Sequence, residues 1–362
     1  MAGMESPLKE LWKELGPELL AAGGMETAAC YGEPAEAVAR ARRAAGVVDL
    51  SYRVQCRATG ADRIGYLHRI VSCDVQDLKP GDIAGGLFLT ARGRVVADFL
   101  LGVLPDRVEI LAPFEARQAL VQGLSKYAIA DEVAFEDRAG ASALLGVVGP
   151  RADEIVRRLR EGEGPGEEGP AILETRLAGA DAVLIRTRRA DFPVRLLLVE
   201  AAAAPGVFLA ARAAAEAAGG GLLGARGLEM LRVEGGIPRL GAEFGEETLP
   251  QEAGLAGHVS FTKGCFLGQE PVARLQNRGH TNRGLAGIRL GAGTPVPAPG
   301  SAVRLGEKEV GRITSAVLSA TLGVPIALAL LRHEAGAPGT AVIVETPEGP
   351  NSGVTTSLPF VT

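Results

Sequence analysis

The chain has 362 residues, of which 47% are hydrophobic, and its formal net charge is −5. This length exceeds what one typical hydrophobic core organises and favours two or three domains. The negative charge argues against bulk electrostatic binding to nucleic acid or to an anionic membrane surface.

The cysteines indicate a reduced protein. Cys30, Cys56, Cys73 and Cys265 are far apart and form no C-x-x-C pair, so neither a zinc site nor a disulfide framework is expected. The first residues lack the apolar stretch of a signal peptide, and the apolar run Val324–Leu331 is too short to span a bilayer. We therefore expect a cytoplasmic protein with no metal site and no membrane partner.

Strands and helices are expected to alternate through the first two thirds of the chain. Early helices are predicted at Pro7–Leu20, Pro34–Ala45 and Ala61–Ile70, and a central strand at Arg94–Leu104. Three strands then each lead through a proline into a helix, because proline fits the first helical turn. These pairs are Arg107–Leu111 with Phe114–Leu124, Leu144–Val148 with Ala152–Arg160, and Arg195–Val199 with Val207–Ala218.

The last quarter of the chain is predicted to form a separate domain made of strands. Gly291–Gly300 carries three prolines and three glycines and indicates a domain boundary, whereas Glu161–Pro170 is too polar for a core and predicts an exposed loop. Short turn-separated strands follow the boundary and favour a small all-β module. They are Ala302–Leu305, Glu309–Leu318, Ile326–Leu331 and Ala341–Glu345.

Chemistry is suggested first by Lys263–Glu270, which reads Lys-Gly-Cys-Phe-Leu-Gly-Gln-Glu. A nearby cation lowers the pKa of a thiol and creates the nucleophilic thiolate, so Lys263 is expected to activate Cys265. A lone cysteine is ordinarily a small buried hydrophobe. The two glycines and the polar neighbours favour the reactive alternative.

Charged residues inside apolar patterns give the other candidates. Asp98 lies within the apolar strand Val95–Leu101, where a carboxylate is costly unless it is paired, serves a site or faces water. Arg226, Arg232 and Glu234 belong to a predicted helix, where ordinary surface charge is the alternative. A basic cluster after the octapeptide is either a solvated loop or a site for an anionic ligand tail or RNA phosphates. Its members are Arg274, Arg278, His280, Asn282 and Arg283.

The octapeptide resembles the signature of the YgfZ family, folate-binding relatives of the glycine-cleavage aminomethyltransferase that support iron–sulfur enzymes. Ala44–Ser51 and Gly224–Gly254 are similar to segments of the aminomethyltransferase, and Val310–Ser315 to its C-terminal barrel. The resemblance implies an α+β fold with two ferredoxin-like α/β domains around a central hole and a C-terminal small β-barrel. The implied domains are residues 1–52 with 141–280 for folate binding, 53–140 for the second α+β domain, and 284–362 for the barrel.

The resemblance also implies a site. Tetrahydrofolate or a one-carbon derivative would bind in the central hole, with Asp98 where the aminomethyltransferase keeps its catalytic aspartate and Arg226 where it has an arginine near folate. The catalytic set would be Cys265, Lys263 and Asp98. The folate-binding set would be Asp98, Arg226, Glu234, Gln269 and Glu270.

Three functions fit this resemblance. The preferred one is a folate-dependent accessory protein for assembly or repair of iron–sulfur clusters, affecting tRNA methylthiolation, with iron–sulfur enzymes or assembly proteins as partners. The alternative is a tetrahydrofolate-dependent aminomethyltransferase of a glycine-cleavage system. The third is a folate-binding module without chemistry. The pterin-binding Gly-Glu-x-Gly-Phe-Glu element of the aminomethyltransferase has no match around Ala190–Glu200, which favours the accessory function.

Overall fold

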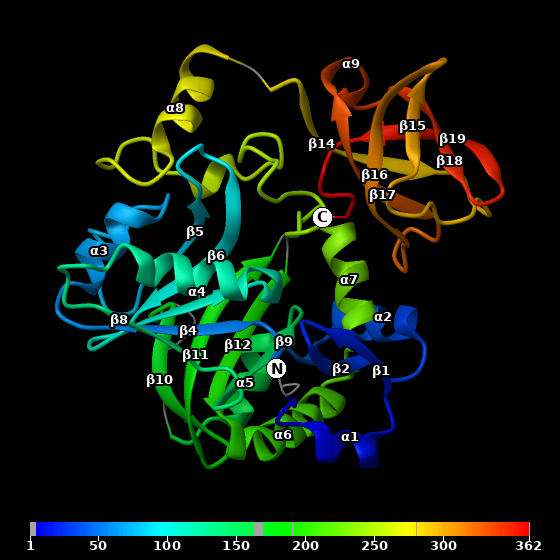
Figure 1. Ribbon diagram of the computed structural model, residues 1–362. Coiled ribbons are helices and arrows are strands. Elements are labelled where there is room, and N and C mark those ends of the chain that lie inside the picture. The colour runs from blue at the N-terminus through cyan, green and yellow to red at the C-terminus, as the bar shows by residue number, and fades with distance from the viewer. Residues whose placement is uncertain (1–4, 163–168, 190–191, 280, 362) are drawn as a thin grey trace.

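The computed structural model describes residues 5–162, 169–189, 192–279 and 281–361. Within these ranges the chain forms a six-stranded sheet, a five-stranded sheet, a closed six-stranded barrel and an N-terminal hairpin. Figure 1 shows the two sheets packed together and the barrel set to one side of them. This architecture confirms the predicted α+β fold class with a C-terminal β-barrel.

The N-terminal segment departs from its prediction. The helix expected at Pro7–Leu20 is only α1 (Lys9–Leu15), because Gly16 adopts a left-handed φ of 61° and its N–H caps Trp12 O. Pro17 follows, and the chain turns into the hairpin β1 (Glu18–Ala22) and β2 (Met25–Cys30). The next helix, α2 (Pro34–Arg43), forms as predicted.

The six-stranded sheet has the order β10-β11-β12-β9-β3-β13 and is antiparallel except for the parallel pair β3–β13. One face packs on α5 (Ala152–Leu159) and α6 (Ala204–Ala217), while the other packs against the five-stranded sheet. Its strands are β3 (Gly46–Asp49), β9 (Ser142–Val148), β10 (Ile172–Leu177), β11 (Ala180–Arg189), β12 (Phe192–Glu200) and β13 (Gly221–Leu222). Most of the predicted loop Glu161–Pro170 lies outside the described residues.

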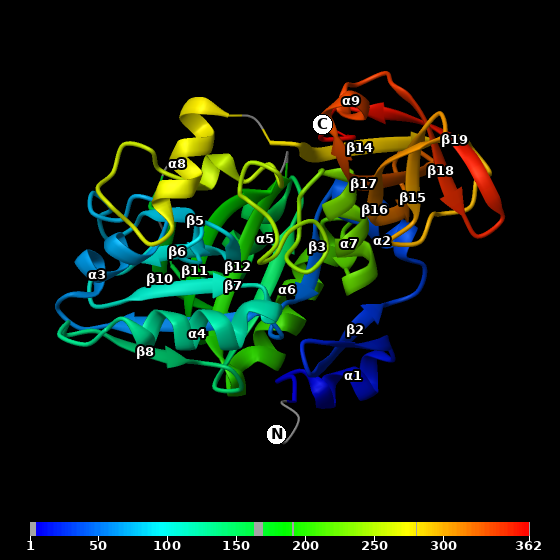
Figure 2. The same ribbon diagram turned by 45° about the horizontal axis from the view of Figure 1, so that its top comes forward.

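The five-stranded sheet has the order β5-β6-β7-β4-β8 and carries α3 (Arg63–Ile70) and α4 (Arg117–Lys126). Its strands are β4 (Val54–Thr59), β5 (Ile83–Leu89), β6 (Val95–Val103), β7 (Val108–Ala112) and β8 (Ala134–Asp137). Residues 240–272, which the sequence grouped with the folate-binding domain, place their buried apolar side chains in the core of this second sheet. They include the 3₁₀ turn Ala256–His258 and the start of α8 (Gln269–Arg278), which lies beside β5 and β6 in both views (Figures 1 and 2).

The barrel closes in the order β14-β17-β16-β15-β18-β19. Its elements are β14 (Arg283–Leu290), β15 (Ala302–Leu305), β16 (Lys308–Leu318), β17 (Pro325–Arg332), α9 (His333–Gly336), β18 (Ala341–Thr346) and β19 (Gly349–Thr356). Strand β19 was not predicted, because its Gly-Pro-Asn-Ser-Gly start reads as a turn. Helix α7 (Ala225–Glu234) runs from β2 and α2 to the barrel (Figure 1).

Candidate functional site

Asp98 lies in the middle of β6, and the alternation of that strand sets its surroundings. Val95, Ala97 and Phe99 are buried on one face of the strand, whereas Asp98 is half-buried on the other and pairs in register with Leu87 of β5. The Oδ1 atom of Asp98 is buried and accepts no hydrogen bond from any described residue. Burying such an atom is costly unless water or a ligand supplies a donor, which makes Asp98 a candidate ligand contact.

His258 lies on the same face of the sheet. Gly85 is two residues from Leu87 on β5, and a Cβ at Gly85 would come within 2.9 Å of the His258 ring, so only glycine lets the imidazole lie on this strand. Gly85 and Asp98 are diagonal cross-strand neighbours, with a separation of about 7–8 Å. No sequence pattern marks His258, because only the tertiary packing of the Ala256–His258 turn brings its ring onto Gly85 of β5.

Ser72 fixes the His258 turn to the sheet. Its hydroxyl donates to His258 O at 2.6 Å and accepts from the Leu87 N–H at 2.8 Å. Helix α4 covers the opposite face, where Gly123 meets the Phe88 ring. The Asp98 face is therefore the one turned toward residues 255–268, not toward the helices.

Lys263 and Cys265 point to different environments. The Lys263 ammonium is buried and donates hydrogen bonds to the carbonyls of His68, Val71 and Cys73, just where α3 ends. Burial lowers the pKa of Lys263 to about 8. Cys265 is exposed. The structure thus gives Lys263 the role of an anchor for the loop and records no contact through which it would activate the thiol.

Glu234 is enclosed within the protein. Its Oε2 accepts from Arg42 of α2 and its Oε1 accepts from Ser319 and Thr321, which follow β16 of the barrel. Both carboxylate oxygens are therefore used to join the barrel to the body of the molecule. This placement differs from the folate contact expected from the sequence, because no free acceptor faces a ligand.

Arg226 lies near the start of α7, the helix that ends at Glu234. It forms an ion pair with Glu18 of the N-terminal hairpin, and both side chains are about half exposed. The structure records no contact between Arg226 and the Asp98 face. Arg232, two residues before the end of α7, instead enters the barrel junction, where it donates to Glu243 and Ser315.

The end of the octapeptide packs on the turn between β5 and β6. Gly268 has a left-handed φ of 79°, and a Cβ there would lie 2.3 Å from Thr90 O, so glycine is required for this close approach. Gln269 is half-buried at the first position of α8, and Glu270 is exposed and pairs with Arg274. The octapeptide thus lies beside β6, although no contact joins Gln269 or Glu270 to Asp98.

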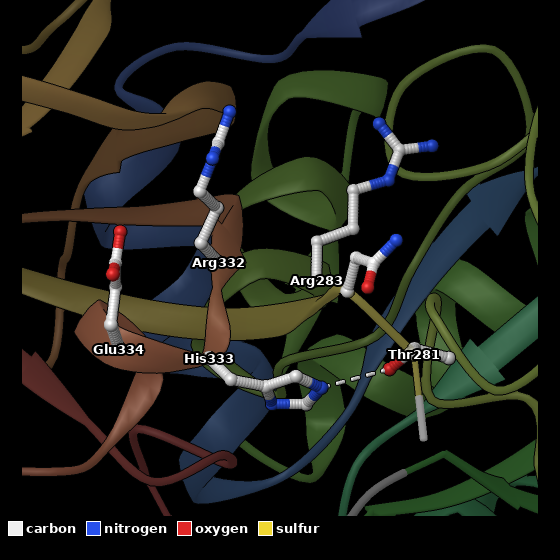
Figure 3. A pocket seen from close by; sticks show the side chains of 6 residues that line it. Thr281, Arg283, Arg332, His333 and Glu334 are labelled. Carbon is white, nitrogen blue, oxygen red and sulfur yellow. Dashed lines mark hydrogen bonds between the residues drawn. The ribbon is translucent and has the colours of Figure 1, made fainter. Parts of the chain in front are cut away.

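A separate cleft opens where the chain enters the barrel (Figure 3). It has a volume of about 780 Å³. Thr281, Asn282 and Arg283 line one side, and Arg332, His333 and Glu334 line the other. Asn282 and Arg283 of the predicted basic cluster line this cleft, whereas Arg274 pairs with Glu270 on α8 and His280 lies outside the described residues.

In the described part of the chain, no helix has both the length and the apolar character needed to cross a membrane. Within the same ranges, no group of three or more His, Cys, Asp or Glu side chains is arranged to hold a metal ion.

Comparisons with known proteins cover nearly the whole chain. Residues 8–263 match the family model of the GCVT N-terminal domain, and residues 283–361 match the glycine cleavage T-protein C-terminal barrel domain. The aminomethyltransferase of Streptomyces coelicolor is 29% identical over 332 residues, covering 91% of this chain and 89% of that protein. The aminomethyltransferase of Bacillus subtilis is 26% identical over 355 residues, covering 94% of each.

A solved structure shares the fold. The crystal structure of glycine cleavage system aminomethyltransferase T from Bartonella henselae superposes with a TM-score of 0.89. The match covers 99% of this chain and 98% of that one at 21% sequence identity. At this identity the likeness establishes a common three-dimensional arrangement.

Proposed function

The chain belongs to the glycine cleavage T-protein family, and from this premise we propose that it is a tetrahydrofolate-dependent one-carbon transfer protein whose site lies on the Asp98 face of the five-stranded sheet. Tetrahydrofolate is the one-carbon acceptor of that family. The observation that carries the proposal is the buried Oδ1 atom of Asp98, which has no hydrogen-bond donor among the described residues.

The residues present fit a folate head group. A flat heterocycle needs a few placed polar groups in apolar walls. Asp98 offers an acceptor for a pterin N–H, the half-buried Leu100 offers apolar surface on the same face, and Gly85 leaves room for the His258 ring. Tetrahydrofolate or a one-carbon derivative therefore suits this face by its chemistry.

Asp98 also suits the transfer reaction. When a carbon–nitrogen bond of an aminomethyl group breaks, positive charge develops on the carbon. A fixed carboxylate in a water-poor setting stabilises that charge without reorganising during the step. Asp98 would act through its charge and its hydrogen bond to the nitrogen of the acceptor, and Ser72 would keep the neighbouring turn in place.

Aminomethyl transfer is better supported than the iron–sulfur function that the sequence first favoured. The Streptomyces and Bacillus relatives are named aminomethyltransferases and match along almost their whole length. The sequence alone favoured the iron–sulfur accessory function because the Gly-Glu-x-Gly-Phe-Glu element is missing, and these relatives reverse that preference. That element would fall partly on residues 190–191, which are outside the described ranges.

A second candidate is kept for one observation, the exposure of Cys265 on a loop anchored by Lys263. In a YgfZ-like cytoplasmic accessory protein this thiol would meet a partner involved in iron–sulfur cluster assembly or repair. Free cysteines are ordinarily among the most buried side chains, and an exposed one is consistent with chemistry.

One experiment separates the two candidates. Aminomethyl transfer to tetrahydrofolate is measured in a reconstituted glycine-cleavage system, and tRNA methylthiolation is measured in cells lacking a YgfZ-type protein. A transferase loses activity on Asp98→Asn and keeps it on Cys265→Ser. If Cys265→Ser abolishes methylthiolation while the wild type transfers no aminomethyl group, the accessory function is correct and the transferase proposal is wrong.

A further inference from the structure

His258 lies in a turn that is fixed to β5, the edge strand of the five-stranded sheet. Ser72 bonds to the Leu87 backbone twice, because its N–H donates to Leu87 O at 3.0 Å and its Oγ accepts from the Leu87 N–H at 2.8 Å. Ser72 also holds the turn: its hydroxyl donates to His258 O at 2.6 Å, and its carbonyl accepts from the Ser260 N–H at 2.9 Å. A side chain carried by a turn with this backbone support has a defined position, as a functional side chain requires.

The imidazole of His258 lies across β5 at a glycine. A Cβ on Gly85 would be 2.9 Å from Cδ2 and 3.1 Å from Nε2 of the ring, so the ring edge that carries Nε2 lies directly on the strand. Gly85 pairs in register with Leu100, and Asp98 is two residues from Leu100 on the same face of β6. A ligand that donates to Asp98 Oδ1 is therefore a neighbour of the imidazole.

Two ionisable side chains share this face of the sheet. Strands β5 and β6 carry one ionisable residue between them, Asp98, and the turn adds His258. A fixed carboxylate stabilises developing positive charge. An imidazole, whose ordinary pKa is near 6.5, takes up and releases protons near neutral pH. The two side chains thus suit two different tasks in one reaction.

The other ionisable groups on the neighbouring segments are turned elsewhere. Asp74 Oδ1 lies 3.3 Å from the imidazole of α3, and the Lys263 ammonium donates to backbone carbonyls. The Cys73 thiol lies against Gly86, on the face of β5 that α4 covers. Asp98 is therefore the charged group of these segments that shares the face with the His258 ring.

We propose that His258 is the proton acceptor of aminomethyl transfer, acting on the tetrahydrofolate nitrogen that attacks the aminomethyl carbon. This inference rests on the proposed function, because it takes the folate ring to lie at Asp98. A bond forms between that nitrogen and the carbon while the bond from the carbon to the amine breaks, and the electron pair of the broken bond leaves with ammonia. The attacking nitrogen then carries an extra proton, which passes to His258 Nε2 and from there to the ammonia, so that ammonium is released.

Proton NMR of the full chain tests the contact without turnover. The chain has four histidines, so the ring resonance of His258 is identified as the one that His258→Gln removes. Tetrahydrofolate should shift this resonance and leave that of His68 in place, because the His68 ring accepts from the Gln76 N–H at 3.2 Å. A His258 resonance that stays unchanged in saturating tetrahydrofolate would overturn the inference.

Steady-state transfer in a reconstituted glycine-cleavage system tests the chemistry. His258→Gln keeps a polar side chain but removes the base, so kcat should fall about 100-fold or more while the calorimetric affinity for tetrahydrofolate changes by less than about threefold. The wild-type kcat should rise with pH as the imidazole loses its proton, and this rise should be absent in the variant. A loss of affinity with unchanged kcat would overturn the assignment, since His258 would then only bind.

Two further variants separate chemistry from folding. His258→Ala leaves space at the turn, so free imidazole should restore transfer to it and not to Asp98→Asn. Gly85→Ala keeps the histidine but displaces its ring from the strand, because the new Cβ would lie too close to Cδ2. Its kcat should also fall. Wild-type kcat in Gly85→Ala, or no response of His258→Ala to imidazole, would contradict the proposal.

The matched control is His68→Asn, which keeps an acceptor for the Gln76 N–H and should leave kcat and its pH dependence unchanged. Transfer by the wild type that His258→Gln leaves intact would overturn the inference and leave the proposed function standing. Absence of both transfer and tetrahydrofolate binding in the wild type would overturn the proposed function itself.

Discussion

The barrel junction and the β6 face both hold carboxylates inside the protein, and the two regions differ in how those carboxylates are hydrogen-bonded. At the barrel junction, Glu234 and Glu243 are fully buried and each of their oxygens accepts at least one hydrogen bond. On the β6 face, Asp98 keeps a buried Oδ1 with no donor among the residues described. The carboxylates at the junction have their acceptors satisfied by the protein itself, whereas the Oδ1 of Asp98 is open to a donor from a ligand or water, as the proposed function requires.

The difference could not be read from local sequence. Glu234 and Asp98 are both acids within largely apolar segments, and both were candidates for folate contact. Their roles separate only when Arg42, Ser319 and Thr321 are brought to Glu234 from distant parts of the chain. The number of donors around each acid therefore decides which effect a substitution has.

The largest effect is expected at the junction. Glu234→Ala would leave Arg42, Ser319 and Thr321 without their acceptor, and breaking such a buried ion pair costs about 3–5 kcal/mol of unfolding free energy. Denaturant unfolding measures this loss. Arg226→Ala, which removes a half-exposed ion pair from the same helix, should cost less than about 1 kcal/mol. Equal losses in the two variants would contradict the distinction.

The second-largest loss of stability is expected at Lys263, which anchors the octapeptide loop. Lys263→Met keeps much of the side-chain bulk but removes the donor from three carbonyls at the end of α3, at a cost on the order of 1–3 kcal/mol. Cys265→Ser is the matched control, because Cys265 is exposed and its replacement should change stability by less than about 0.5 kcal/mol. A Lys263→Met protein as stable as the wild type would show that the anchor is dispensable.

The pH dependence of stability tests the same lysine. Burial lowers the pKa of Lys263 from 10.5 to about 8, so between these values the unfolded chain holds more protons at this site than the folded one. The unfolding free energy of the wild type should therefore rise with pH across that window relative to Lys263→Met, by up to about 3 kcal/mol. Below pH 8 the difference should be flat. A difference that falls between pH 8 and 10.5 would contradict the assignment.

The smallest change in stability, with the opposite sign, is expected at Asp98. Asp98→Asn replaces a carboxylate that is partly desolvated and lacks a donor at Oδ1. The unfolding free energy of the ligand-free protein should therefore stay the same or rise by no more than about 1 kcal/mol. Thermal unfolding of the two proteins without folate checks this. A loss comparable to that of Glu234→Ala would place Asp98 among the structural acids.

Local patterns in the sequence predicted many elements, including β6, β9, α5 and the barrel strand Ala302–Leu305. The N-terminal hairpin was not predicted, because Gly16 and Pro17 end a helix whose apolar pattern continues. Asp98 could be selected from sequence because a carboxylate inside a strand stands out. His258 could not, because only the tertiary packing of the Ala256–His258 turn brings its ring to Gly85. Lys263 was placed beside the thiol by spacing, whereas burial turns its ammonium toward the carbonyls of α3.

Binding of tetrahydrofolate to the wild type, Asp98→Asn and Arg226→Ala is the most direct test of the Asp98 site. Calorimetry should show saturable binding by the wild type, a loss of at least about tenfold in affinity for Asp98→Asn, and little change for Arg226→Ala. Arg226 is the suitable control because its partner is Glu18, at the other end of α7 from the barrel. Unaltered affinity in Asp98→Asn, with a loss in Arg226→Ala, would contradict the site.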